Sequence, residues 1–323
     1  MRRPRPAPPE TLELDIEKLG TEGTGLARAG SRVLLVPDAL PGERVRVRVE
    51  AGKIRLLDRL SDSADRVAPP CRHFGVCGGC VLQHLAEVPY AAFKRGIVLD
   101  ALSRQGLGHV PVAEPLISPP GSRRRATLEA RRVGRGIVLG FHGRASHQII
   151  DLDQCPVLVP SLAALLPALR ALLMALLEPG KSASIILTNA LTGIDLGLDL
   201  PVEPKLAALE TLSDFARHHD LARLWWRVEG AAPTLLAQNR PARIRFGAVE
   251  ADLPPGVFLQ ATAEGEAALI AAVGHAVGNA RRIADLFAGM GTFTLALSDR
   301  AGLQAVESDA EALGALAAAA RRA

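Results

Sequence analysis

The sequence lacks the features of a secreted or membrane-spanning protein. Its basic, proline-rich amino terminus is followed by the acidic segment Thr11–Glu17, where a signal peptide requires an apolar core. Its longest apolar run, Val157–Leu177, is broken by two prolines and by Arg170, which favours a buried or amphipathic helix over a membrane span. We therefore expect a cytoplasmic protein that makes no membrane contact.

Cysteine is scarce, with four residues in a chain of 323, and none follows Cys155. Because disulfides are rare in the cytoplasm, cysteines there are better candidates for metal ligands. Cys71, Cys77 and Cys80 have five and then two residues between them, and two glycines fill the shorter gap. Cys155 stands alone, far along the chain, and is followed by proline.

The spacing of the cysteines favours an iron–sulfur cluster. Three clustered cysteines with a distant Cys-Pro are typical of a [4Fe–4S] cluster. A structural zinc site is the main alternative, but zinc usually binds two pairs of closely spaced ligands. Unconnected buried cysteines are a third interpretation, although Cys77-Gly-Gly-Cys80 lacks the periodicity of a core segment. The predicted metal ligands are Cys71, Cys77, Cys80 and Cys155.

The remaining composition is that of a globular protein with local positive charge. The chain is 48% hydrophobic and 22% charged, and it is long enough for two or three domains with separate cores. The net charge is only +4, yet arginines cluster over residues 2–5, 44–59, 123–135 and 240–245. Such clusters indicate phosphate contacts, with solvated surface arginine as the alternative.

Changes in composition and periodicity divide the chain into four segments. Residues 1–10 are predicted to be a disordered basic arm, 11–62 a small β-barrel, 63–250 a central α/β domain that carries the cysteines, and 251–323 an incomplete α/β domain. The third segment is expected to contain helices at 88–105, 162–177 and 202–218, and strands at 126–132, 137–142, 148–152, 183–187 and 223–228.

The predicted barrel is of the nucleic-acid-binding kind. Short segments such as Val45–Glu50 alternate apolar and polar residues, and glycines mark the turns between them. The alternation places Arg44, Arg46 and Arg48 on one face of the sheet. This row predicts a track for the phosphates of a nucleic acid.

The sharpest motif is a glycine-rich turn between a strand and a helix, within Arg281–Leu297. Asp285 lies near the end of an apolar strand and Gly289 and Gly291 form the turn, so a ligand can approach the backbone there. Glu307 ends the next strand, where its carboxylate can accept hydrogen bonds from ribose hydroxyls.

The ligand that this turn suits best is S-adenosylmethionine. A dinucleotide is the alternative, but its binding fingerprint requires a third glycine where this chain has Thr294. The carboxylate of Asp285, before the glycines, suits a cationic nucleoside that carries no phosphate.

Taken together, these motifs resemble the bacterial RNA (uracil-5)-methyltransferases, in particular the iron–sulfur branch that acts on 23S ribosomal RNA. The resemblance covers nearly the whole chain. The segments that carry it are Glu17–Leu26 (the opening of a TRAM domain), Cys71–Cys80 (the cluster loop), Ser146–Leu152 with Cys155-Pro156 (the fourth cluster ligand), Phe258-Leu-Gln260 (the entry to the methyltransferase domain) and Asp285–Phe293 (the cofactor signature).

The resemblance implies cofactor contacts and a partner. The residues assigned to S-adenosylmethionine are Gln260, Asp285, Phe287, Gly289, Gly291, Thr292 and Glu307. Thr292 and Thr262 stand where asparagine is common in the family. The tRNA-specific relatives lack both the barrel and the cluster, so 23S ribosomal RNA is favoured over tRNA as the partner. A monomer is expected.

The family's chemistry requires a cysteine that this chain does not offer. Uracil C5 is a weak nucleophile, so a thiolate adds to C6, the activated base attacks the methyl group and a general base removes the C5 proton. In the family this cysteine and the base glutamate follow the second cofactor strand, so we expect both beyond Ala323. No catalytic residue is assigned within the chain, and it is expected to be incomplete and inactive.

The leading hypothesis is an S-adenosylmethionine-dependent RNA uracil-C5 methyltransferase. Its expected fold is multidomain: a TRAM-like β-barrel, a central α/β domain with the cluster loop, and a partial class I Rossmann-like methyltransferase domain. A non-catalytic iron–sulfur RNA-binding protein is the alternative, which the missing cysteine favours. A nicotinamide- or flavin-linked iron–sulfur oxidoreductase is a third hypothesis, but it leaves the barrel unexplained.

Overall fold

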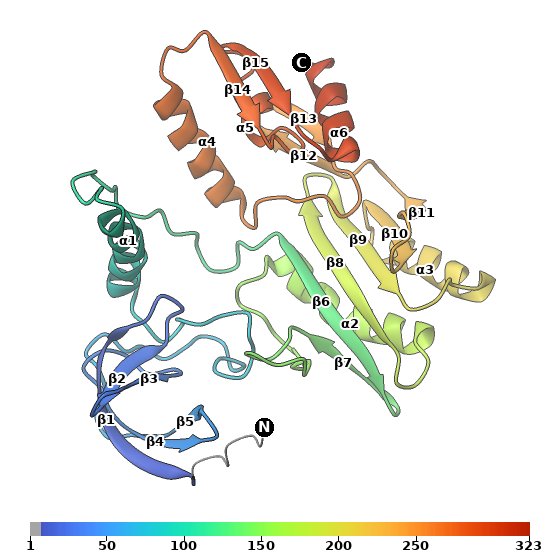
Figure 1. The fold of residues 1–323 in the computed structure, drawn as a ribbon. Coiled ribbons are helices and arrows are strands. Elements are labelled where there is room, and N and C mark those ends of the chain that lie inside the picture. Colours follow the sequence, from blue (N-terminus) through green and yellow to red (C-terminus); the bar gives the residue numbers. More distant parts are fainter. Residues whose placement is uncertain (1–7) are drawn as a thin grey trace, which may run out of the picture. The chain divides into compact units, whose positions relative to one another are not determined.

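The computed structural model describes residues 8–323 and separates into two compact units, one ending at Ile117 and the other beginning at Ser118 (Figure 1). The predicted arm over residues 1–10 falls mostly outside the described residues, and Glu10 already belongs to the first strand. Among residues 8–323, no helix is long and apolar enough to cross a membrane.

The first unit opens with a curved antiparallel sheet. Its strands are β1 (Glu10–Leu19), β2 (Gly25–Ala29), β3 (Arg32–Val36), β4 (Arg44–Glu50) and β5 (Lys53–Arg59), in the order β3-β2-β1-β4-β5. The predicted alternation is confirmed, because Leu14, Val45 and Val47 enclose a core while their neighbours face outward. The predicted closure is wrong. The short edge strand β3 approaches β5, but no hydrogen-bonded ladder joins them in the described part of the chain.

The cysteine loop and one helix complete the first unit. A bridge between Arg66 and Leu85 closes the base of this loop, which we define as residues 67–84. Helix α1 (Glu87–Arg104) follows and matches its predicted position to within one residue at each end. None of its side chains is fully buried.

The second unit is built on a six-stranded sheet. Its strands are β6 (Arg125–Val133), β7 (Gly136–Gly140), β8 (Ser182–Ala190), β9 (Gly193–Leu200), β10 (Arg223–Val228) and β11 (Thr234–Gln238), in the order β11-β10-β9-β8-β6-β7. Helices α2 (Pro160–Leu176) and α3 (Leu206–His218) pack against the sheet and against each other. Leu162, Leu166 and Leu169 of α2 are buried, which confirms that the longest apolar run forms a buried helix.

The sheet is mixed, within a segment for which the sequence predicted only a central α/β domain. Within this sheet only β9 and β10 are parallel neighbours. Strands β8 and β9 are joined by the two residues Leu191-Thr192, and a connection this short makes an antiparallel hairpin. The strand predicted at 148–152 is also wrong, because it is reduced to one bridge between His142 and Ile149.

The last part of the second unit carries the glycine-rich turn. Its elements are the hairpin β12 (Arg243–Phe246) and β13 (Val249–Asp252), α4 (Ala263–Val277), β14 (Arg282–Leu286), α5 (Thr292–Ala296), β15 (Gly302–Val306) and α6 (Ala310–Ala320). β14 and β15 are parallel neighbours, as predicted. The hairpin shares a core with Met290, Leu295 and Ala312, so a boundary at residue 251 would divide β13.

Candidate functional site

The glycine-rich turn leaves β14 through a strained backbone. Phe287 has a φ of 60°, and the residue is 89% exposed. Gly291 has a φ of 97°, and a Cβ placed there would lie 2.9 Å from side-chain atoms of both Leu295 and Leu316. Gly289 has a φ of 56°, but a Cβ placed there would meet no heavy atom within 4 Å. Gly291 is thus required by packing, whereas the open space at Gly289 lets a ligand approach the backbone.

The carboxylate of Asp285 holds the start of α5. Its Oδ2 atom accepts hydrogen bonds from the backbone N–H of Thr294 at 3.1 Å and from the Thr294 hydroxyl at 2.6 Å. Thr294, where a dinucleotide site would have its third glycine, therefore has a local role in shaping the turn. Asp285 supports the turn from the strand side as well as being a candidate cofactor contact.

The carboxylate of Glu307 ties the turn to the end of β15. Its Oε2 atom accepts from the Gly289 N–H at 2.8 Å, and its Oε1 atom accepts from the N–H groups of Ser308 at 2.7 Å and Asp309 at 2.9 Å. The hydrogen bonds from Asp309 and then Gly289 hold the pKa of Glu307 below its ordinary value. The Ser308 hydroxyl also donates to Oε1 at 3.3 Å, whereas within the described chain Oε2 accepts only from Gly289. Because each carboxylate oxygen has two lone pairs, Oε2 can still accept from a ribose hydroxyl.

Gln260 lies in the segment before α4, fixed by buried charges. The Arg124 guanidinium donates to the Gln260 carbonyl at 3.2 Å and to the Glu266 carboxylate at 2.7 Å, and Arg124 and Glu266 are both buried. Thr262 stands where asparagine is common in the family. Its side chain caps α4 by accepting a hydrogen bond from the Gly265 N–H. Sequence reasoning missed Arg124 and Glu266, which lie 142 residues apart.

The structure thus brings together part of the predicted cofactor set. Hydrogen bonds link the turn at Gly289 to Glu307, and Asp285 to α5, whose first residue is Thr292. No described hydrogen bond links Gln260 or Phe287 to that group. The second unit also contains a cavity of about 900 Å³, lined by residues that include Ser122, Arg124, Glu266, Ile270 and Arg300, and by none of the predicted cofactor residues.

The cysteine loop carries three of the four predicted metal ligands. Cys71, Cys77 and Cys80 are half-buried and belong to no disulfide among residues 8–323, and the Gly79 N–H donates to Cys77 Sγ at 3.4 Å. Cys155 is also half-buried and belongs to the second unit. Over residues 8–323, no three cysteine, histidine or carboxylate side chains are grouped as ligands of one metal ion. The convergence of the four cysteines therefore stays a prediction.

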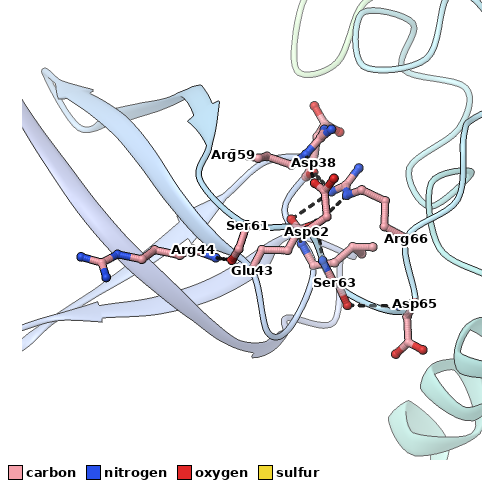
Figure 2. Close-up of polar contacts among 10 residues, drawn as sticks. Asp38, Glu43, Arg44, Arg59, Ser61, Asp62, Ser63, Asp65 and Arg66 are labelled. Carbon is pink, nitrogen blue, oxygen red and sulfur yellow. Dashed lines mark hydrogen bonds and ion pairs between the residues drawn. The ribbon is translucent and has the colours of Figure 1, made fainter.

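A buried carboxylate fastens the base of this loop to the sheet. Glu43 is fully buried and accepts from the Leu40 N–H at 2.9 Å and from the Arg66 guanidinium at 3.0 Å (Figure 2). Arg66 also donates to the carbonyl of Asp38 at 2.8 Å. Burial raises the pKa of Glu43, but the hydrogen bonds from Arg66 and Leu40 outweigh it and leave the pKa below its ordinary value.

The predicted phosphate track is partly neutralised. Arg44, Arg46 and Arg48 do lie on one face of β4, but Glu13 on β1 pairs with Arg44 at 3.1 Å and with Arg46 at 3.0 Å. Asp58 on β5 pairs with Arg46 at 3.2 Å. The row is thus not uniformly available to phosphates.

The sequence is similar to a known RNA-binding domain family and to RNA methyltransferases. A TRAM domain family model matches residues 9–57, which hold β1 to β4 and most of β5. An uncharacterised RNA methyltransferase of Brucella suis is 40% identical over 314 residues, covering 95% of this chain and 72% of the relative. The 23S rRNA (uracil(1939)-C(5))-methyltransferase RlmD of Alkalilimnicola ehrlichii is 35% identical over 332 residues, covering 97% and 74%.

A solved structure shares the fold. The tRNA (uracil-54, C5)-methyltransferase of Pyrococcus abyssi, in complex with S-adenosyl-L-homocysteine, aligns with a TM-score of 0.73 at 21% identity. The alignment covers 96% of this chain and 76% of that structure. At this level of identity the likeness concerns the arrangement of the backbone. A coverage of 96% takes in most of the five-stranded sheet, so the expectation that tRNA-specific relatives lack the barrel is wrong for this structure.

Proposed function

Because the chain belongs to the RNA (uracil-5)-methyltransferase family, we propose that its second unit binds S-adenosylmethionine and that its substrate is a uridine of 23S ribosomal RNA, at C5. The single observation that supports the cofactor site best is the junction of Gly289 and Glu307. It joins an open backbone position to a carboxylate at the ends of two adjacent parallel strands, where α/β folds bind nucleosides.

In this proposal each residue of the turn has a distinct role. Glu307 accepts from the ribose hydroxyls while its other acceptor positions keep the turn in place. Gly289 leaves room for the nucleoside beside the backbone, and the exposed ring of Phe287 offers an apolar face for the adenine. Asp285 holds the start of α5 through Thr294, and Thr292 offers its hydroxyl to the cofactor. Gln260 contributes its side-chain amide from the segment before α4.

We propose that Cys71, Cys77, Cys80 and Cys155 hold a [4Fe–4S] cluster. The donor chemistry fits, since four thiolates are the usual ligands of such a cluster. Anaerobically purified protein should be brown and contain about four irons. A colourless protein with one zinc would favour the zinc site instead, and a metal-free protein would contradict both.

Assigning all four cysteines to the cluster leaves none for catalysis. Methyl transfer to uracil C5 requires a thiolate that adds to C6, and the chain contains no fifth cysteine. We therefore propose that these 323 residues bind cofactor and RNA without transferring the methyl group. This is the behaviour of the second candidate, a non-catalytic iron–sulfur RNA-binding protein.

Two measurements on the same preparation test the proposal. Calorimetry with S-adenosylhomocysteine should show binding that is lost in Glu307→Ala, and no binding by the unchanged chain would contradict the cofactor site. A methylation assay with labelled S-adenosylmethionine and 23S ribosomal RNA should show no turnover. Turnover would assign catalysis to one of the four cysteines and would contradict the four-thiolate cluster.

A further inference from the structure

The outer face of the first sheet separates its charges into two groups. Strand register places Glu13 opposite Arg46 and Asp15 opposite Arg44, with Asp58 on the far side of Arg46. We call Arg44 and Arg46 the paired group, since two cations there face three carboxylates. One step further along β4, the residues opposite Arg48 on β1 and β5 are not acidic.

The second group is basic. Arg48 lies opposite Arg55 on β5, and Glu50 lies opposite Lys53. On its other side Arg48 faces Thr11 of β1, which carries no charge. We call Arg48, Lys53 and Arg55 the basic group, because three cations there share one carboxylate.

The partners of the two groups confirm this division. In the paired group, hydrogen-bonded ion pairs join Arg44 and Arg46 to Glu13, and Arg46 to Asp58. In the basic group, Arg48 is 3.4 Å from Glu50, and no ion pair among residues 8–323 involves Lys53 or Arg55. The side chain of Arg48 is 49% exposed.

Two arginines directly opposite each other on adjacent strands repel and destabilise the sheet. An anion placed between them removes this repulsion and gains hydrogen bonds from both guanidinium groups. The paired group offers no such gain, because a phosphate would first have to displace Glu13 or Asp58.

We propose that the phosphate backbone of RNA binds this sheet at Arg48, Lys53 and Arg55, and not at Arg44 and Arg46. The inference rests on the proposed RNA-binding function and specifies where the sheet contacts its partner. A different role is also open to such residues, since cations on an edge strand such as β5 discourage edge-to-edge aggregation. The two roles predict different results.

The test measures binding of a short fluorescein-labelled oligouridylate across a series of KCl concentrations. Each phosphate contact to a single strand contributes about 0.7 to the slope of the logarithm of the binding constant against the logarithm of salt concentration. The double variant Arg48→Ala/Arg55→Ala should therefore flatten the slope by about 1.4. The matched variant Arg44→Ala/Arg46→Ala removes the same charge from the same face and should keep the wild-type slope.

The outcomes separate this inference from the proposed function. A slope that flattens only in the paired-group variant, or equally in both, overturns the inference while RNA binding stands. An unchanged slope with new aggregation of the Arg48→Ala/Arg55→Ala variant shows that these residues protect an edge, and also overturns it. Absence of RNA binding by the unchanged chain overturns the function and the inference together. Circular dichroism should show the same fold for both variants.

Discussion

Glu43 and Arg66 form a buried ion pair that joins the five-stranded sheet to the start of the cysteine loop (Figure 2). The side chain of Glu43 is 0% exposed and that of Arg66 is 11% exposed, and 23 residues separate them in sequence. The base of the cysteine loop is thus fixed to the sheet through a contact that needs no metal. This ion pair holds one end of the loop independently of any cluster.

Glu43→Gln should destabilise the first unit by about 3 kcal/mol, because it leaves the Arg66 guanidinium buried without its counter-charge. Urea denaturation at neutral pH measures the change. Glu17→Gln is the matched control, since the Glu17–Arg28 pair is 3.4 Å long and exposed, and such pairs contribute little. Equal effects of the two substitutions would contradict the role assigned to Glu43.

The Glu43–Arg66 pair should make the stability of the first unit depend on pH. The pKa of Glu43 is below its ordinary value in the folded chain, so its ionised form stabilises the fold above the unfolded pKa of about 4.3. This contribution is lost as the pH falls through the lower, folded pKa. The difference in stability between the unchanged chain and Glu43→Gln should therefore shrink on acidification. A difference that stays constant would show that Glu43 acts through shape alone.

The two glycines of the turn should respond differently to alanine. Gly291→Ala places a Cβ 2.9 Å from Leu295 and Leu316 at a φ of 97°, so it should lower the melting temperature, with a cost of about 1–3 kcal/mol. Gly289→Ala meets no atom, so it should cost only about 1 kcal/mol for its positive φ and chiefly weaken S-adenosylhomocysteine binding. Normal affinity in Gly289→Ala would show that the ligand does not approach there.

Glu307→Gln should loosen the turn. An amide has one acceptor oxygen, so it cannot accept from both the Gly289 N–H and the N–H groups of Ser308 and Asp309. Hydrogen exchange at Gly289 should become faster, while exchange in β6 stays unchanged as an internal control. Unchanged protection of the Gly289 amide would contradict the link between the turn and β15.

Local patterns predicted the elements better than they predicted their partners. The alternation of β4 and the glycine turn after β14 are visible in the sequence because each depends on neighbouring residues. Strand β9 was missed because Gly197 interrupts its pattern. That glycine is explained only by Trp225, which would lie 2.1 Å from a Cβ at this position.

The phosphate track shows the same limit. Alternation correctly places Arg46 on an outer face, but it does not show that Glu13, 33 residues earlier, lies opposite. Acidic residues alternate along β1 and basic residues alternate along β4. Recognising that these two patterns are complementary could have indicated that the two strands pair. The contact of Arg124 with Glu266 had no such signal, because it joins the residue before β6 to helix α4, which is distant in sequence.

Replacing Arg124, which holds the Gln260 carbonyl, should lower the stability of the second unit, and acid should reverse this loss. Arg124→Met leaves the Glu266 carboxylate buried without a counter-charge and should cost roughly 3–5 kcal/mol at neutral pH. Burial raises the pKa of Glu266 above its ordinary value even with Arg124 opposing it, and losing Arg124 should raise it further. A carboxyl group whose folded pKa is raised destabilises the fold above that pKa, and the penalty disappears as the pH falls through it and the group is protonated. The stability of Arg124→Met, measured by urea denaturation, should therefore approach that of the unchanged chain as the pH is lowered.

The double variant Arg124→Met/Glu266→Leu is the matched control, since it has no carboxyl group at this site and should show no such approach. If the single and double variants have the same pH dependence, Glu266 is not the group that Arg124 neutralises.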